Sequence, residues 1–215
     1  MLKELVFRVA GLPRGHSPLH DLRFLSDARV VFDVGADDGK SVVQFLKAFP
    51  KAQIYSFEPA RMMFCHLRDK FANNRRVSTF NTALGSTNGT ARFTTDLVLT
   101  GLSRIDEYGK DEVPIETLDT FCAREGVEHI DFLKIDTEGH DLEVLKGAMG
   151  MLDRKAIRAV QVEAGMSPEN DFHVSFEKMK SYLDQRGYHA FGIYEQYAPS
   201  ASRWLERVNA IFVAR

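Results

Sequence analysis

The stretch Val30–Lys40 reads VVFDVGADDGK and decides the fold of this chain. A short apolar run ends in an acid and a valine, and a loop that contains Gly35 and Gly39 follows it. Ser41–Phe49 then places apolar residues at positions i, i+3, i+4 and i+7, which predicts an amphipathic helix. A buried strand, a glycine loop and a helix in this order are typical of the first unit of an open α/β sheet.

The segments that follow repeat this alternation of strands and helices. Strands are expected at Gln53–Phe57, within Arg75–Thr82, and at Ile130–Ile135, Ile157–Val162, Tyr188–Tyr194 and Val208–Val213. Helices are expected at Leu19–Leu25, Arg61–Phe71, Thr117–Arg124, His140–Lys146 and Phe172–Gln185. Alternation of this kind predicts βαβ units around a mostly parallel sheet, and the last two strands could pair as an antiparallel hairpin.

We expect residues 1–215 to form a single domain with two additions. Residues 1–26 are expected to be helical, because Leu2, Leu5, Val6 and Val9 share one helical face. Residues 86–116 are rich in turns and alternating patterns, which predicts a small β-rich insertion. Within it, Thr100–Arg104 could close over a substrate or could be a plain surface hairpin.

The bulk composition excludes some classes of protein. The 215 residues are 44% apolar and carry a net charge of −2 with mixed signs, so we expect no nucleic-acid partner. No apolar run approaches the roughly 20 residues of a membrane span. Cys65 and Cys122 have neither metal-ligand spacing nor a disulfide framework, which favours a reducing, cytoplasmic location.

The glycine loop points to a ligand that carries positive charge. Gly35 and Gly39 allow a tight turn and a close approach of the backbone to a ligand. The loop lacks the middle glycine of the dinucleotide fingerprint G-x-G-x-x-G. Asp37 and Asp38 would repel a pyrophosphate, whereas they and Asp33 suit an amino group or a sulfonium.

Two further strand ends carry polar groups. Glu58 ends the second expected strand, where a carboxylate can accept hydrogen bonds from the ribose hydroxyls of an adenosine ligand. It could instead cap the helix that Pro59 begins, and we favour the ribose role. Asn81, Thr82 and Ala83 end the third strand, where they could contact an adenine edge or provide ordinary turn chemistry.

Six blocks in this order resemble the FkbM family of S-adenosylmethionine-dependent methyltransferases. They are VVFDVGADDGKS, IYSFEPA, FNTALG, IETLDTFC, IDFLKIDTEGHDLEVLKGA and VQVEA, and they cover about Val30–Gly165. The resemblance implies a Rossmann-like class I methyltransferase, with a seven-stranded sheet and helices on both faces. It also implies methyl transfer to a hydroxyl group, usually of a sugar, glycolipid or natural product.

The resemblance assigns S-adenosylmethionine as the cofactor and names the residues that hold it. The methionine side falls to Asp33, Gly35, Ala36, Asp37 and Gly39, the ribose to Glu58, and the adenine side to Asn81, Thr82 and Ala83. We add Ser41, Pro59 and Asp136, which adjoin these positions. Many members of the family carry Asn where this chain has Asp37, although an acid can still accept from an ammonium group.

The acceptor is expected at a second acidic strand end, FLKIDTEGH at residues 132–140. His140 could act as general base, because an imidazole titrates near neutrality, or could be a solvated residue of the next helix. Asp136 could serve the cofactor's ammonium group or orient the acceptor, and Glu163 lies on the same rim, so we count Asp136, His140 and Glu163 as candidate catalytic residues. Asp136, Glu138 and Glu163 could gather a divalent ion, but the spacing does not demand one and we expect no metal.

Two other functions stay open on the sequence alone. An NAD(P)-dependent oxidoreductase could use a related sheet, although the missing G-x-G-x-x-G argues against it. A non-catalytic module that binds the cofactor or a partner is the second alternative. The predicted partner is a small-molecule or glycan acceptor.

Overall fold

The computed structural model describes residues 17–95, 103–200 and 203–215. The expected helical face at residues 2–9 and most of the segment 100–104 lie outside the described residues. Among the helices that are described, none has the length and apolar character needed to cross a membrane.

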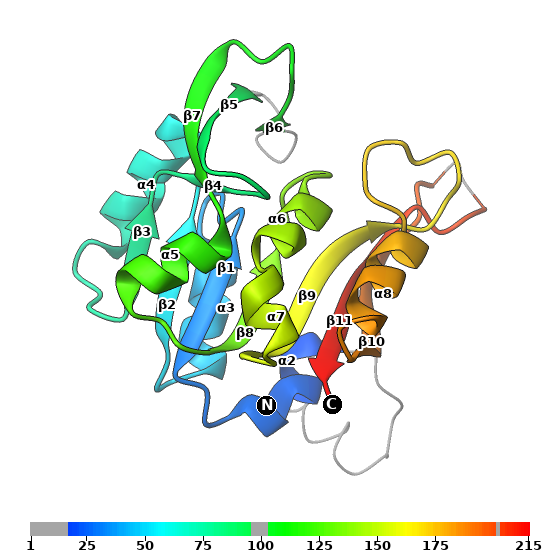
Figure 1. The fold of residues 1–215 in the computed structure, drawn as a ribbon, viewed down its shortest axis with the longest axis horizontal. Coiled ribbons are helices and arrows are strands. Elements are labelled where there is room, and N and C mark those ends of the chain that lie inside the picture. Colours follow the sequence, from blue (N-terminus) through cyan, green and yellow to red (C-terminus); the bar gives the residue numbers. More distant parts are fainter. Residues whose placement is uncertain (1–16, 96–102, 201–202) are drawn as a thin grey trace.

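A seven-stranded sheet forms the centre of the molecule (Figure 1). Its strands are β1 (Val30–Val34), β2 (Gln53–Phe57), β3 (Val77–Phe80), β8 (Ile130–Ile135), β9 (Ile157–Gly165), β10 (Tyr188–Tyr197) and β11 (Arg207–Ala214). They are ordered β10-β11-β9-β8-β1-β2-β3, and only β11 runs antiparallel to its neighbours. The predicted mostly parallel sheet and its terminal hairpin are therefore confirmed.

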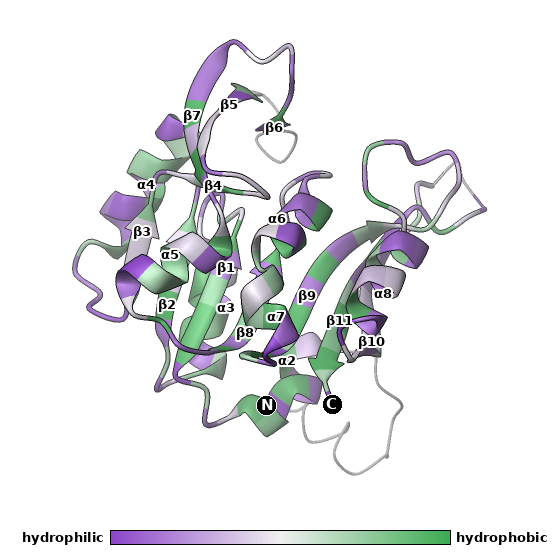
Figure 2. Cartoon of the chain, in the orientation of Figure 1, coloured by the Kyte–Doolittle hydropathy of each residue, from purple (hydrophilic) through white to green (hydrophobic). Residues whose placement is uncertain are grey.

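Helices cover both faces of this sheet. They are α2 (Pro18–Asp21), the 3-10 turn η1 (Leu22–Leu25), α3 (Lys40–Ala48), α4 (Arg61–Phe71), α5 (Leu118–Glu125), α6 (Asp141–Gly147), α7 (Met149–Asp153) and α8 (Phe176–Asp184). Successive strand residues face opposite layers: Phe132 packs with α3, whereas Leu133 packs in the core that includes α5 and α6. Figure 2 shows these central strands as hydrophobic, as expected for strands that are buried on both faces.

The predicted β-rich insertion forms a second sheet at the carboxyl ends of the central strands (Figure 1). Its strands are β4 (Ala83–Leu84), β5 (Gly89–Thr94), β6 (Arg104–Ile105) and β7 (Asp111–Glu116), in the order β4-β7-β5-β6. Phe93, Val113 and Ile115 form its small core with Ala60 and Ala83. This core places the insertion directly beside the end of β2.

Some predicted boundaries were wrong, for identifiable reasons. The helix expected at Phe172–Gln185 begins only at Phe176, because Ser175 caps it and Asn170 holds the amides of Phe172 and His173 in a turn. Strands β9 and β10 run three residues further than the apolar pattern predicts, to Gly165 and Tyr197, and α7 was not predicted at all.

Candidate functional site

The loops after β1 and β8 meet at the point where the strand order reverses. Gly35 adopts φ +79°, and a Cβ atom there would lie 1.8 Å from the carbonyl oxygen of Asp136. The amides of Gly35 and Ala36 both donate to the carbonyl of Phe57 at 3.1 Å. Only glycine allows the two loops to come this close, so they form one continuous floor at the usual ligand position of an open α/β sheet.

A cavity of about 770 Å³, including its open mouth, lies beyond these strand ends. Of the residues predicted to bind the cofactor or to act in catalysis, eight line the cavity: Gly35, Asp37, Glu58, Pro59, Thr82, Ala83, Asp136 and His140. The structure thus brings the predicted cofactor side and the predicted acceptor side into one space.

Glu58 is the most perturbed acid in the cavity wall. Its side chain is buried, and its two carboxylate oxygens accept hydrogen bonds from the backbone amides of Asp37 at 2.9 Å and Ala60 at 2.8 Å. Burial raises the pKa of Glu58 to about 7, and the two amide donors oppose this rise only in part. Glu58 therefore changes its charge close to neutral pH.

Asp33 lies beneath the glycine loop and does not line the cavity. It is fully buried, accepts a hydrogen bond from the Ser41 hydroxyl at 2.5 Å, and lies 3.2 Å from the ammonium of Lys134. Lys134 also pairs with Asp136 at 3.3 Å and donates to the carbonyl of Gly35 at 3.2 Å. Burial alone would lower the pKa of Lys134, but the two carboxylates outweigh it and raise that pKa.

The remaining residues of the predicted methionine side lie around a second hollow. Ala36 and Ser41 line it together with Asp37, Lys134 and Asp136, on the other side of the glycine loop. Gly39 is placed differently, because it begins α3 with φ +74°, and a Cβ atom there would lie 2.6 Å from the ring of Phe71. Its role is to let the helix pack against α4.

The side chain of Asn81 bonds to the turn that follows β2. Its side-chain amide donates to the carbonyls of Glu58 and Pro59, each at 2.9 Å, so its donors are occupied by the backbone. It is absent from the cavity wall, whereas its neighbours Thr82 and Ala83 are part of it.

His140 has the properties of a neutral base. It precedes α6, lines the cavity and is half-buried. Its Nε2 atom has no hydrogen-bond partner among the described residues. Burial lowers the pKa of His140, so the ring is neutral at neutral pH and can accept a proton. The structure therefore disfavours the alternative of a solvated residue.

Asp141 joins the second loop to β9. It is buried and accepts from the amide of Thr137 at 3.2 Å, from the hydroxyl of Thr137 at 2.7 Å and from the amide of Glu163 at 3.1 Å. Burial raises the pKa of Asp141 to about 7. These contacts fix the loop that carries Glu138 and His140.

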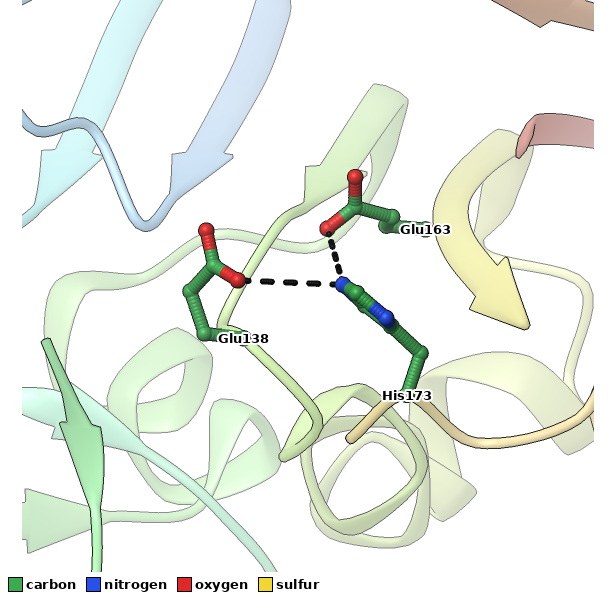
Figure 3. Close-up of side chains that lie close together, drawn as sticks. All are labelled: Glu138, Glu163 and His173. Carbon is green, nitrogen blue, oxygen red and sulfur yellow. Dashed lines mark ion pairs between the residues drawn. The ribbon is translucent and has the colours of Figure 1, made fainter. Parts of the chain in front are cut away.

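Glu163 lies behind the cavity rather than in its wall. Its Oε1 atom pairs with Arg207, and its Oε2 atom lies 3.0 Å from Nε2 of His173 (Figure 3). Glu138, which does line the cavity, lies 3.7 Å from the same nitrogen. His173 and Arg207 were not predicted, because they come from later segments with no spacing pattern toward Glu163.

The insertion contributes to the site as well. Phe93, Ser103 and Ile105 line the cavity opposite the glycine loop. Arg104 stacks on the ring of Phe172 at 4.5 Å, which joins the insertion to the loop that carries His173.

Comparisons with known proteins agree with this geometry. The family model described as the methyltransferase FkbM domain matches residues 33–190. The 2-O-methyltransferase NoeI of Sinorhizobium fredii is 28% identical over 144 residues, which cover 58% of this chain and 59% of that protein. The hexuronic acid methyltransferase AglP of Haloferax volcanii is 26% identical over 145 residues, which cover 66% of this chain and 59% of that protein.

A solved structure shows the same fold. TrmK of M. capricolum, in complex with S-adenosylhomocysteine, is 12% identical and has a TM-score of 0.54. The alignment covers 92% of this chain and 67% of that one. The chain therefore has the class I methyltransferase fold, and it spans about three fifths of the length of the two curated relatives that it matches.

Proposed function

Because the chain belongs to the FkbM methyltransferase family, we propose that it transfers the methyl group of S-adenosylmethionine to a hydroxyl group of a sugar, glycolipid or other small molecule. The observation that carries this proposal is the shared cavity. One wall holds a buried acid suited to a ribose, and another holds a neutral imidazole whose Nε2 atom has no hydrogen-bond partner among the described residues.

The residues present fit the cofactor. The carboxylate of Glu58 forms part of the cavity wall and can accept hydrogen bonds from ribose hydroxyls when it is ionised. Gly35 leaves the floor free of side chains. Asp37 and Asp136 supply negative charge on both sides of the floor, which favours a ligand that carries an ammonium and a sulfonium. Met63, Leu84 and Ile105 add apolar surface for a base.

The acceptor side can assist removal of the hydroxyl proton. The bound cofactor supplies an electrophilic methyl group. His140 is neutral and lines the cavity, and its Nε2 atom, which is buried beside Gly85 in the ligand-free chain, would accept the proton of the acceptor hydroxyl once the acceptor reaches it. Asp136 can orient the acceptor, since a third of its side chain is exposed. Glu163 acts indirectly, through its contact with His173 behind Glu138.

The name of one curated relative supports a carbohydrate acceptor, and the name of the other supports methylation of an oxygen atom. One is named for 2-O-methylation and the other for hexuronic acid. We propose an acceptor of this class rather than a nucleic acid, because the net charge of −2 provides no concentrated basic surface. We also propose a reducing, cytoplasmic location, since Cys65 and Cys122 are both free.

Two measurements test the proposal. Calorimetry with the full chain should show binding of S-adenosylmethionine and S-adenosylhomocysteine and none of NADH. Transfer of labelled methyl groups should then be screened over simple sugars, hexuronic-acid glycans, glycolipids and polyketide-like alcohols. Binding of NADH without S-adenosylmethionine would overturn the proposal in favour of an oxidoreductase. Cofactor binding without transfer to any acceptor of these classes, under conditions in which a known methyltransferase is active, would favour a binding module.

A further inference from the structure

Three side chains from separate parts of the chain converge behind the acceptor side of the cavity (Figure 3). Glu138 follows β8, Glu163 lies near the end of β9, and His173 lies in the loop before α8. One atom from each, a carboxylate oxygen or an imidazole nitrogen, lies within 4.8 Å of the other two. Such a set of two carboxylates and one imidazole is a common ligand set for divalent metal ions.

The cluster is buried, and its donor atoms face one another. The side chains of Glu163 and His173 are 7% and 9% exposed. Nε2 of His173 forms ion pairs with Oε2 of Glu163 and Oε2 of Glu138, and both Nε2 and Oε2 of Glu163 point to the centre of the cluster without a hydrogen bond to any other described residue. Donor atoms that face one another around a common centre in this way can bind a cation in place of the ion pairs.

The other atoms of the two buried side chains are held in place. Asn170 faces Nδ1 of His173 with its side-chain amide, whose nitrogen lies at 3.1 Å and whose oxygen lies at 3.2 Å, and the same oxygen accepts from the backbone amide of His173 at 2.9 Å. With the proton on Nδ1, the ring donates to this oxygen and turns the lone pair of Nε2 toward the cluster. Metal-binding histidines are usually oriented by such a contact. Arg207 holds Oε1 of Glu163 and leaves Oε2 for the centre.

The distances match a metal site as well. Nε2 of His173 lies 3.0 Å from Oε2 of Glu163 and 3.7 Å from Oε2 of Glu138. Two ligand atoms that each lie about 2.1 Å from an ion are roughly 3.0 Å apart when the ligand–ion–ligand angle is a right angle. They are roughly 3.7 Å apart when that angle is somewhat wider than tetrahedral. Glu138 adopts φ +53°, which is strained for a residue other than glycine and turns its carboxylate toward the other two.

We propose that Glu138, Glu163 and His173 bind a divalent first-row transition metal ion of the Mn²⁺ or Zn²⁺ type. Arg207 contacts only Oε1 of Glu163, so Oε2 of Glu163, a carboxylate oxygen of Glu138 and the imidazole of His173 remain as three donors for an ion at the centre. The imidazole favours such an ion over Mg²⁺ or Ca²⁺, which prefer oxygen ligands only.

The site also bears on the proposed function, on which this second part rests. Three protein ligands leave coordination positions open. Glu138 belongs both to the cluster and to the cavity wall. Since Glu163 and His173 lie behind the wall, an acceptor oxygen would reach an open position only from the Glu138 side, where the cluster meets the cavity.

The metal site is tested by direct binding rather than by activity. The metal-free full chain is titrated with Mn²⁺, and the free ion is followed by electron paramagnetic resonance. We expect about one ion per chain. His173→Gln and Glu138→Gln should each weaken binding by at least about tenfold, because each removes a ligand. His66→Ala and Glu112→Gln are the matched controls, since both residues are exposed and lie away from the cluster.

A second measurement needs no variant. Co²⁺ bound by nitrogen and oxygen ligands gives visible absorption bands, which should appear in the wild-type chain and vanish when Zn²⁺ is added. Absence of both the bands and Mn²⁺ binding at millimolar metal would overturn the proposal and leave a plain ion-pair cluster. Equal Mn²⁺ affinity in folded His173→Gln, Glu138→Gln and control chains would overturn it too. These results do not depend on methyl transfer, so they are separable from failure of the proposed function.

Discussion

Replacing Glu58 with glutamine should remove most of the pH dependence of cofactor binding. In the ligand-free chain, burial raises the pKa of Glu58 to about 7. Ribose hydroxyls donate hydrogen bonds, so they favour the ionised carboxylate over the protonated acid. Binding of S-adenosylmethionine therefore has to remove the proton whenever Glu58 is protonated.

The size of the effect follows from this pKa. About nine tenths of the Glu58 side chains are ionised at about pH 8 and about one tenth at about pH 6. The Kd of the wild-type chain for S-adenosylmethionine should therefore be about tenfold higher at the lower pH, which corresponds to about 1.4 kcal/mol. The Glu58→Gln chain cannot ionise at this position and should show a nearly flat profile with weaker binding at the higher pH.

Calorimetric titrations at several pH values between these limits measure both chains. The ligand's own titrating groups affect the two proteins equally, so the difference between the curves isolates Glu58. S-adenosylhomocysteine serves as a second ligand without the sulfonium charge. A wild-type curve that is as flat as the Glu58→Gln curve would refute the assignment of Glu58 to the ribose or its raised pKa.

Unfolding experiments decide between those two explanations. Because the folded pKa of Glu58 exceeds the ordinary value of 4.5, the folded chain binds more protons than the unfolded chain between these two pH values. The contribution of Glu58 to the free energy of unfolding is complete below about pH 4.5. It is lost as the pH rises to about 7, and the loss is at most about 3 kcal/mol. Glu58→Gln should lack this part of the loss. If it shows the same pH slope as wild type, the raised pKa is wrong rather than the ribose contact.

Three further predictions concern single residues of the site. His140→Ala should lower kcat by about 10²-fold or more with little change in cofactor Kd, and an unchanged kcat would remove His140 from the mechanism. The kcat of the wild-type chain should fall only at acidic pH, because burial lowers the pKa of His140. Gly35→Ala should lower the free energy of unfolding, measured in urea, by at least about 3 kcal/mol, because the new Cβ would meet the carbonyl of Asp136. Gly126 has a similar φ but open space around it, so Gly126→Ala should cost only about 1 kcal/mol. Equal losses would contradict the close packing of the two loops. Lys134→Met should destabilise the chain by about 3 to 5 kcal/mol, since it leaves a buried carboxylate without its cation, and a loss below about 1 kcal/mol in the same assay would show that this ion pair is not formed.

The core of the fold could be predicted because the central strands are buried on both faces. Their mostly apolar runs set the bounds of β1, β2 and β8 as the structure has them. Strand β7 could not be predicted, because it is half exposed and contains Pro114, and its burial depends on the small core of the insertion. The start of α8 was misplaced because Asn170 competes for the backbone amides that a longer helix would use.

The site was predictable only where its residues follow a strand. Glu58, Asp136 and His140 lie at or just beyond strand ends, and the topology of a parallel sheet brings such ends together. His173 comes from a loop without periodicity, and only the packing of that loop against the β8 loop places it beside Glu163. Asp33 was predicted to face the ligand, but Ser41 and Lys134 hold it underneath the loop.

The burial of Lys134 also determines how this amine reacts. Acylating reagents attack the neutral form of an amine, and the raised pKa keeps Lys134 protonated while its side chain remains 90% covered. Asp38 raises the pKa of Lys40 as well, but the Lys40 side chain is 82% exposed and is therefore open to reagents in solution. Acylation of Lys134 therefore requires the loops after β1 and β8 to separate. The rate of labelling at Lys134, relative to the rate at Lys40, therefore measures how often the floor of the cavity opens.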